Sequence, residues 1–176
     1  MAVGRPAPAV ATTTRLTPVL RSGWVPTVVA MSRLPTDLFT AIDHVGVAVP
    51  DLDEAIAFYR DTFGMTLAHE EVNEEQGVRE AMMAVGGSGS HIQLLAPLSP
   101  ESTIAKFLDR SGPGVQQVAY RVEDLEAVSQ VLRDRGLRLL YEEPRRGTSN
   151  SRVNFIHPKD AGGILVELVQ PAHETH

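Results

Sequence analysis

The sequence contains no cysteine, which excludes disulfide bridges, thiolate metal sites and a thiol nucleophile. It also contains no apolar run of about 18 residues, the length that a membrane-spanning helix needs, so we expect no membrane association. The net charge is −6, and no Lys/Arg-rich run with interleaved aromatic residues is present. These features argue against nucleic acid as a partner. A chain of 176 residues favours one domain with a core of its own.

Acidic residues are absent from the first 36 positions, which carry four arginines and are rich in Pro, Ala and Thr. Such a stretch offers little apolar surface to bury. We interpret residues 1–37 as a disordered leader, or as spurious upstream sequence if the true start is Met31. An organellar transit peptide has a similar composition. We therefore expect a cytoplasmic protein, or a mitochondrial matrix protein if residues 1–36 are a transit peptide.

The chain contains the same short pattern twice. Residues 43–61 align without a gap on residues 116–134, a shift of 73 positions. In this alignment His44 falls on Gln117. After a one-residue slip, the segment IQLLAP falls on VELVQP, which places Gln93 on Glu167. Internal repetition predicts a duplicated half-domain, with these four residues gathered around one pseudo-twofold axis.

Hydrophobic periodicity in the first copy predicts a strand followed by a helix. Residues 41–49 alternate between two faces, and Asp51 then caps a helix over residues 52–63 that Gly64 ends. Further strands are expected near residues 66–71, 78–85 and 91–95.

The second copy repeats this order. It has a strand over residues 115–122, a helix capped by Asp124 and a stop at Gly136. Residues 100–110 predict a helix that links the copies. The remaining strands are expected near residues 137–141, 151–156 and 164–169.

Four polar residues stand alone in apolar strands. Gln93 and Glu167 each lie between apolar neighbours, and His44 and Gln117 share their strand faces with small residues. A buried, unpaired carboxylate is unfavourable, so Glu167 should have a cationic partner. Taken singly, each residue has an ordinary structural explanation, such as an arginine paired with Glu167. Taken together, their symmetric placement favours one metal site.

The residue types restrict the choice of metal. One imidazole nitrogen with three oxygen donors, and no thiolate, does not suit a closed structural zinc site. An octahedral site for Co²⁺, Mn²⁺, Ni²⁺ or Mg²⁺, with two positions open for a chelating substrate, suits it better. The predicted fold is therefore α+β, with two tandem βαβββ modules forming a curled mixed sheet around the metal and with helices outside. It is a single domain over residues 38–172: module one 38–98, linking helix 99–113 and module two 114–172.

Glu80 is a further candidate, because it shares a strand face with apolar residues in the segment EEQGVREAMMAV. A carboxylate in a partly apolar pocket has a raised pKa and suits a general base. An ordinary solvent-facing glutamate is the alternative. Counting thirteen residues back from Gln93 gives Glu80, and the same count from Glu167 gives Asn154, so we expect these two positions to be equivalent.

The paired modules with one metal between them resemble the vicinal-oxygen-chelate superfamily of glyoxalases, extradiol dioxygenases and bleomycin-resistance proteins. Within it, the segments IDHVGVAVPDLDEAIAFY, EEQGVREAMM, GVQQVAYRVEDLEAV, LLYEEPRRGT, NFIHPK and LVELVQP are similar to the methylmalonyl-CoA epimerase family. The similarity runs from about residue 39 to residue 171. One departure stands at Gln117, where the family motif has histidine; an amide oxygen can still bind a metal.

The resemblance implies a homodimer that interconverts the (R)- and (S)-forms of methylmalonyl-CoA. It implies one divalent ion per chain, characteristically Co²⁺ but with Mn²⁺, Ni²⁺, Mg²⁺ or Zn²⁺ as alternatives, held by His44, Gln93 and Glu167. We add Gln117 to this ligand set. The expected reaction removes and returns the C2 proton through a metal-stabilised enolate, with Glu80 and Glu167 as the proton carriers.

Two other functions stay open at this point. A glyoxalase-type lyase or isomerase shares the metal but typically has glutamate where this chain has Gln93. The other is a metal-free ligand-sequestering protein of the bleomycin-resistance kind. Such a protein would have no reason to keep the four candidate ligands at equivalent positions of the repeat. The phosphates of coenzyme A need cationic partners, and five basic residues are candidates. Each of them could equally be an ordinary solvent-exposed residue: Arg79, Lys106, Arg145, Arg146 and Arg152.

Overall fold

The structure is a computed structural model that describes residues 38–172. The interpretation of residues 1–37 as a leader therefore falls outside the described residues. The first half of the described chain runs through one strand, one helix and three strands: β1 (Ala41–Ala48), α1 (Leu52–Phe63), β2 (Thr66–Asn73), β3 (Val78–Ala84) and β4 (His91–Pro97).

The second half repeats this order after a linking helix. Its elements are α2 (Thr103–Ser111), β5 (Gly114–Arg121), α3 (Leu125–Asp134), β6 (Arg145–Arg146), β7 (Arg152–Ile156) and β8 (Leu165–Gln170). Two short 3₁₀ turns flank β7, namely η1 (Thr148–Asn150) and η2 (Pro158–Asp160).

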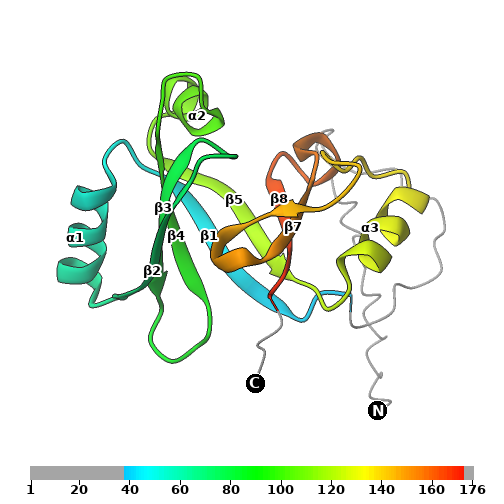
Figure 1. Cartoon of the computed structure of the whole chain (residues 1–176), viewed down its shortest axis with the longest axis horizontal. Helices are drawn as coiled ribbons and strands as arrows, with labels where there is room; N and C mark the ends of the chain where they lie inside the picture. Colours follow the sequence, from blue (N-terminus) through cyan, green and yellow to red (C-terminus); the bar gives the residue numbers. More distant parts are fainter. Residues whose placement is uncertain (1–37, 173–176) are drawn as a thin grey trace, which may run out of the picture.

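All eight strands form one curled mixed sheet in the order β2-β3-β4-β1-β5-β8-β7-β6. The central strands β1 and β5 are antiparallel, and each has a parallel outer neighbour, β4 and β8 respectively. Figure 1 shows the two halves curling to either side of this central pair, with α1 and α3 on the outside and α2 at one end. The predicted fold class is confirmed.

The strand register obeys the pseudo-twofold relation that the repeat predicts. His44 lies opposite Ala119, and Gly46 lies opposite Gln117, so the repeat partners exchange places across the axis. Gly46 also lies beside Gln93 in β4, as Ala119 lies beside Glu167 in β8. The four polar residues therefore come from the four central strands, two from each half.

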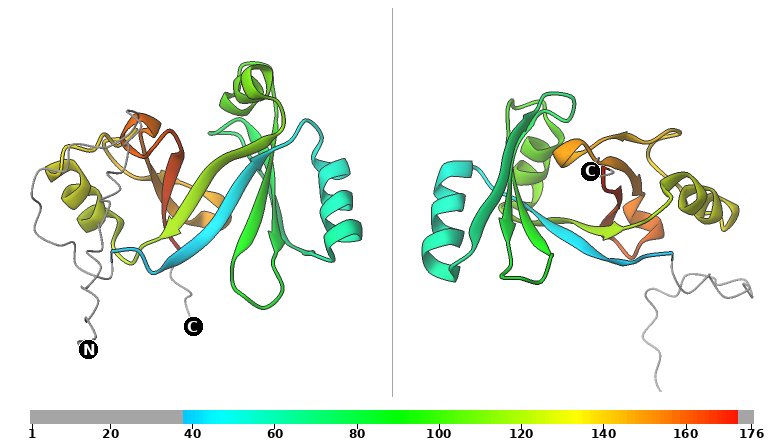
Figure 2. Two further views of the ribbon diagram at one scale, coloured as in Figure 1. Left: turned by 180° about the vertical axis from the view of Figure 1, so that it is seen from behind. Right: turned by 60° about the horizontal axis from the view of Figure 1, so that its bottom comes forward.

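α1 begins and ends where the sequence predicts, whereas the linking helix α2 begins three residues later than predicted, after the cap Ser102. The Asp51 side chain accepts a hydrogen bond from the Glu54 amide at 2.9 Å, and Gly64 closes α1 in the left-handed region at φ 68°. The apolar side of α1, with Leu52 and Ile56, packs on the outer face of β3 and β4. In the second half α3 packs in the same way on β7 and β8. Figure 2 shows both helices on the outer side of the sheet, away from its concave face.

One predicted strand is wrong. Residues 137–141 form only an isolated bridge, between Leu139 and Ile156, and the sixth strand is β6 instead. The cause is a side chain that takes the place of the ladder. Asn154 Oδ1 accepts from the Tyr141 amide at 3.2 Å, and Asn154 Nδ2 donates to the Tyr141 carbonyl at 2.9 Å. The Tyr141 backbone thus bonds to a side chain of β7, so the ladder that includes the bond from the Leu140 amide to the Phe155 carbonyl at 2.8 Å does not continue.

The expected equivalence of Glu80 and Asn154 is also wrong, by one residue. Gln93 pairs with Met82, and Glu167 pairs with Phe155. The residue equivalent to Glu80 is therefore Val153. Asn154 therefore lies on the opposite face of its strand. The prediction failed because counting the same number of residues back from Gln93 and Glu167 ignores the different lengths of the β3–β4 and β7–β8 connections.

Within the described part of the chain, no helix combines the length and the hydropathy that a membrane crossing would need.

Candidate metal and acid–base site

The four polar residues of the repeat converge on the concave face of the sheet. His44, Gln93, Gln117 and Glu167 are all buried, with at most 6% of any of them exposed. His44 Nε2 lies 3.1 Å from Glu167 Oε2, and Gln117 Nε2 donates to Gln93 Oε1 at 3.3 Å. The Gln117 amide also contacts the Glu167 carboxylate. The side chains thus meet in one continuous polar cluster inside an otherwise apolar sheet.

The other ring nitrogen of His44 is held by its chain neighbour. His44 Nδ1 lies 3.0 Å from Asp43 Oδ1, and Arg121 donates to Asp43 Oδ2 at 2.9 Å through Nε. The register of β1 against β5 slips between Ile42 and His44. A bulge of this kind re-aims the extra side chain, so Asp43 reaches the imidazole beside it. This arrangement fixes the ring and leaves Nε2 directed toward Glu167, as in histidine–carboxylate pairs around metals.

Positive charge is favoured at this position. Burial lowers the pKa of His44, but the hydrogen bonds with Asp43 and Glu167 and the charges of both carboxylates outweigh it and raise the pKa to about 9. An imidazolium between two buried carboxylates balances their negative charge, as a bound cation would.

The absence of a side chain at Gly46 leaves room for Gln117. A Cβ placed on Gly46 would lie 2.6 Å from Gln117 Cγ and 3.1 Å from its Cδ. Gly46 and Gln117 face each other across the central strand pair. Gly46, which shares a strand face with His44, therefore leaves space for Gln117, the candidate ligand of the second module.

Glu80 lies beside this cluster and is only 1% exposed. Its Oε2 accepts from Gln93 Nε2 at 3.0 Å, and its Oε1 accepts from the Thr148 hydroxyl at 2.8 Å. Burial raises the pKa of Glu80 to about 7, and the charges of Glu71 and Glu167 act in the same direction, against the Thr148 hydrogen bond and the charge of His44. A carboxyl group with this pKa can both accept and release a proton near neutrality.

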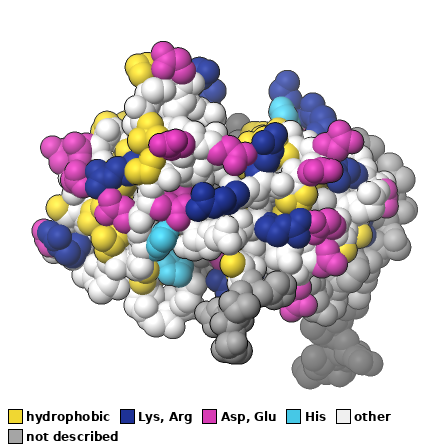
Figure 3. All heavy atoms as spheres, viewed as in Figure 1, with side chains coloured by type: hydrophobic (Ala, Val, Ile, Leu, Met, Phe, Trp, Pro, Cys, Tyr) yellow, Lys and Arg dark blue, Asp and Glu magenta, His cyan; other side chains and the backbone are white. Residues whose placement is uncertain are grey.

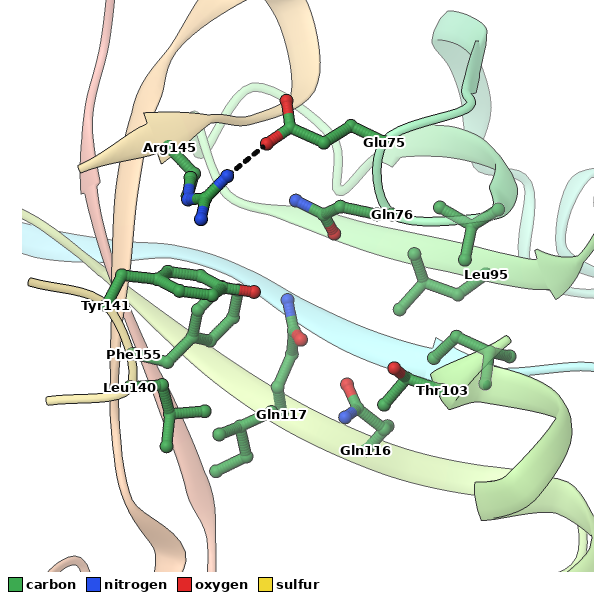
Figure 4. Close-up of a pocket in the computed structure, with 13 residues that line it drawn as sticks. Glu75, Gln76, Leu95, Thr103, Gln116, Gln117, Leu140, Tyr141, Arg145 and Phe155 are labelled. Carbon is green, nitrogen blue, oxygen red and sulfur yellow. Dashed lines mark hydrogen bonds and ion pairs between the residues drawn. The ribbon is translucent and has the colours of Figure 1, made fainter. Parts of the chain in front are cut away.

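Two cavities flank the cluster. One, of about 400 Å³, is lined by Gln117, Tyr141 and Arg145, among others. Figure 4 shows the side chains of Gln117 and Tyr141 directed into it, with Arg145 paired to Glu75 above them. The other, of about 570 Å³, is lined by His44 and Glu167, among others. Residues of the polar cluster therefore line two different cavities.

Two separations within the cluster are compatible with the spacing of ligands around a divalent ion. Ligands at about 2.1 Å from an octahedral ion lie roughly 3 Å from each other, which is close to the His44–Glu167 and Gln117–Gln93 separations of 3.1 Å and 3.3 Å. A half-turn of the Gln117 amide would present its oxygen in place of its nitrogen. The described residues contain no group of three or more His, Cys, Asp or Glu side chains arranged for a metal, since two of the four donors here are amides.

All four arginines named as candidate phosphate partners already face carboxylates. Arg79 pairs with Asp53 and Glu70 on the α1 side of the sheet. Figure 3 shows Lys and Arg side chains interspersed with Asp and Glu on the face it displays. Of these arginines, Arg145 lines the cavity beside Gln117, where it also lies over the Tyr141 ring with its guanidinium carbon 5.0 Å from the centroid.

Sequence reasoning found the five central residues and missed two of their partners. Asp43 has a signal in the sequence, its position next to His44, but the bulge that turns it inward has none. Thr148 has no signal, because it reaches Glu80 from 68 positions away. The structure brings the five predicted residues together, and their roles stay predictions.

Comparisons with known proteins agree with this geometry. Residues 43–155 match the model of the Glyoxalase/Bleomycin resistance protein/Dioxygenase superfamily. The crystal structure of methylmalonyl-CoA epimerase from Mycobacterium tuberculosis is 61% identical and superposes with a TM-score of 0.77, over 81% of this chain and 95% of that one. A structure of methylmalonyl-CoA epimerase in complex with methylmalonyl-CoA and NH4+ is 47% identical, with a TM-score of 0.74 over 76% and 96% of the two chains.

A curated relative extends the similarity. The ethylmalonyl-CoA/methylmalonyl-CoA epimerase of Cereibacter sphaeroides is 38% identical over 131 residues, which span 73% of this chain and 96% of the relative. The family model and these near full-length matches cover the modules that build the polar cluster. The chain therefore belongs to the glyoxalase/bleomycin resistance/dioxygenase superfamily and, within it, to the methylmalonyl-CoA epimerase family.

Proposed function

We propose that this protein is an epimerase that interconverts the (R)- and (S)-forms of methylmalonyl-CoA. The observation that carries the proposal is the buried cluster in which one imidazole, two amides and one carboxylate converge beside Glu80, a second buried carboxyl group. Membership of the family supports it, as does the relative whose structure is a complex with methylmalonyl-CoA.

The chemistry of the substrate matches this cluster. C2 of methylmalonyl-CoA lies between a thioester carbonyl and a carboxylate, so loss of its proton places negative charge on the thioester oxygen. A divalent ion held by His44, Gln93, Gln117 and Glu167 would supply a Lewis acid for that charge. The buried surroundings of the side chains strengthen every charge interaction there.

Inversion at C2 needs a proton removed from one face and returned to the other. Glu80 suits one of these steps, because its pKa of about 7 is near the operating pH. Glu167 is the candidate for the other face. Its role as a ligand would lower its basicity, so either it alternates between the two duties or another group carries the second proton.

We further propose that the chain binds one divalent ion, with Co²⁺ as the expected metal, and that residues 38–172 form a single domain that assembles into a homodimer. Large apolar side chains left exposed on α1, Phe58 at 53% and Phe63 at 57%, support self-association. Elemental analysis of the purified protein identifies the ion, and sedimentation equilibrium measures the oligomeric state.

The deciding experiment is NMR of methylmalonyl-CoA in D₂O. We expect the enzyme to exchange the C2 hydrogen for deuterium and to convert a single epimer into a mixture of both, and we expect removal of the metal to stop both processes. An enzyme loaded with metal that leaves the C2 signal intact would contradict the proposal. Turnover of a glutathione hemithioacetal would indicate a glyoxalase-type enzyme, and purification without any metal would indicate a ligand-sequestering protein.

A further inference from the structure

Thr148 connects the second module to the candidate acid–base residue and a candidate ligand of the first. It begins the 3₁₀ turn η1, which lies against β2 of the first module. Its hydroxyl oxygen is 2.8 Å from Glu80 Oε1 and 2.8 Å from Gln93 Nε2. These three side chains form a closed ring, because Gln93 Nε2 also donates to Glu80 Oε2 at 3.0 Å.

When Glu80 is ionised, the chemistry of the ring fixes the direction of each hydrogen bond. An ionised carboxylate can only accept, and the amide nitrogen of a glutamine can only donate. The Thr148 hydroxyl has one proton, so it donates to Glu80 and accepts from Gln93. Both N–H groups of the Gln93 amide are then used, one on Glu80 and one on Thr148. Its oxygen must face the other way, and there it accepts from Gln117 at 3.3 Å.

The reverse orientation of the Gln93 amide would be unfavourable. It would set the Gln93 oxygen against two acceptors, the Glu80 carboxylate and the Thr148 oxygen, and leave the Gln93 nitrogen facing the proposed metal position. A divalent ion binds the oxygen of an amide, since the nitrogen has no lone pair to offer. The orientation of this amide therefore determines whether Gln93 is able to act as a ligand.

We propose that Thr148 is a positioning residue: its hydroxyl holds the Gln93 amide with the oxygen toward the metal site and holds the Glu80 carboxylate in the same contact. The inference rests on the proposed function, because it takes Gln93 as a ligand and Glu80 as a proton carrier. Thr148, a residue of the second module, would thereby link metal binding by Gln93 to proton transfer by Glu80.

The backbone around Thr148 is built to keep the hydroxyl in place. Ser149 and Asn150 both adopt left-handed conformations, with φ 53° and 58°, which non-glycine residues rarely adopt. The turn is anchored on the first module by a hydrogen bond from the Ser149 amide to Glu71 Oε2 at 3.2 Å. At Gly147 a Cβ would lie 2.5 Å from Val153 Cγ1, so the chain passes too close there for any side chain.

The test compares Thr148→Val, which keeps the shape and loses the hydroxyl, with Thr148→Ser, which keeps the hydroxyl. Metal-free protein is titrated with Co²⁺ against a chelator, and circular dichroism verifies the fold. We expect Thr148→Val to weaken Co²⁺ binding by about 10- to 100-fold, the range for residues that orient metal ligands, and to lower the kcat of C2 exchange. Thr148→Ser should restore both. If the valine variant does not fold, Thr148→Ala takes its place.

Gln93→Ala separates failure of this inference from failure of the ligand assignment. We expect Gln93→Ala to weaken Co²⁺ binding, and Thr148→Val to add no further loss in that background, because both changes act through one amide. If Gln93→Ala weakens binding while Thr148→Val binds Co²⁺ as the wild type does, the role of Thr148 is refuted and the ligand set survives. Unchanged binding by Gln93→Ala overturns the ligand set and, with it, this inference.

Discussion

Asp43 and His44 are consecutive residues of one strand, yet their side chains meet, with Asp43 Oδ1 3.0 Å from His44 Nδ1. In a regular strand they would point to opposite faces of the sheet. The bulge between Ile42 and His44 brings them together, and Arg121 neutralises the outer oxygen of Asp43. The pair directs His44 Nε2 into the site.

Loss of the Asp43 carboxylate should weaken metal binding through the orientation of His44. We expect Asp43→Ala to raise the Kd for Co²⁺ by about 10- to 100-fold and Asp43→Asn to raise it less, since an amide oxygen still accepts from Nδ1. Isothermal titration of metal-free protein measures both. The matched control is Asp53→Ala, which removes an exposed aspartate paired with Arg79. Equal affinities for all of these proteins would show that Asp43 has no part in the site.

A side chain at position 46 should displace Gln117. The Cβ of Gly46→Ala would lie 2.6 Å from Gln117 Cγ, which forces Gln117 to move or the strands to separate, at about 1–3 kcal/mol for overpacking. We expect weaker metal binding and a lower Tm. Gly87→Ala, at a position with open space around the added Cβ, should change neither. Full metal affinity in Gly46→Ala would mean that Gln117 is dispensable.

Glu80 should be required for proton transfer without being required for metal binding. Glu80→Gln keeps the shape, and the Thr148 hydroxyl can accept from the new amide. We expect metal stoichiometry to survive while epimerisation falls by about 10²–10⁴-fold, as for loss of a positioned general base. NMR of a single enantiomer in D₂O measures the effect. Normal epimerisation by a variant with its full metal content would remove Glu80 from the reaction.

The raised pKa of Glu80 should also appear in the stability of the metal-free protein. Its pKa is about 7 in the fold against an ordinary value of 4.5, so between these pH values the folded state holds a proton that the unfolded state has released. Stability contributed by this group is therefore present below pH 4.5 and lost as the pH rises to about 7, by up to about 3 kcal/mol.

Glu80→Gln has no such group, so its stability relative to the wild type should increase over the same pH range. Urea unfolding at pH 5 and pH 8 measures the difference. Comparison of the two proteins cancels the contribution of His44, whose raised pKa of about 9 acts in both. Parallel stability curves would indicate that Glu80 titrates at its ordinary pH.

The fifth prediction concerns the amide at position 117. Gln117→His supplies a nitrogen donor in place of an amide oxygen, and nitrogen donors favour the later transition metals. We expect affinity for Zn²⁺ and Ni²⁺ to rise relative to Mg²⁺ and Mn²⁺ in competition titrations. An unchanged order of preference would place Gln117 outside the ligand set.

Much of the fold was predictable because it depends on local signals. Asp51 and Gly64 mark the ends of α1 through hydrogen bonds within a few residues, and alternation of apolar residues marks the strands. The internal repeat supplied the long-range information, since it placed His44 and Gln117 in matching positions before any contact was known.

The errors arose where side chains or loop lengths decide the outcome. Asn154 bonds to the Tyr141 backbone and so replaces a strand that periodicity alone predicts. The match of Glu80 with Asn154 failed because the connections differ in length. The bulge at Asp43 and the contact of Thr148 with Glu80 depend on tertiary packing, which leaves no pattern in a single sequence.

The pseudo-twofold axis relates the two halves of the site but not the two proposed proton carriers. The register makes Val153 the counterpart of Glu80, and Gln93 the counterpart of Glu167. With Glu80 and Glu167 as the proton carriers, the two epimers of the substrate would meet unlike groups. One is a carboxyl group with a pKa of about 7 that is bonded to a threonine, and the other is a carboxylate beside an imidazole. The equilibrium constant between the two epimers is close to unity, because they differ only in the configuration at C2. The kinetic isotope effects of the two directions are under no such constraint, and the unequal halves of this duplicated fold would give proton removal from each epimer a transition state of its own.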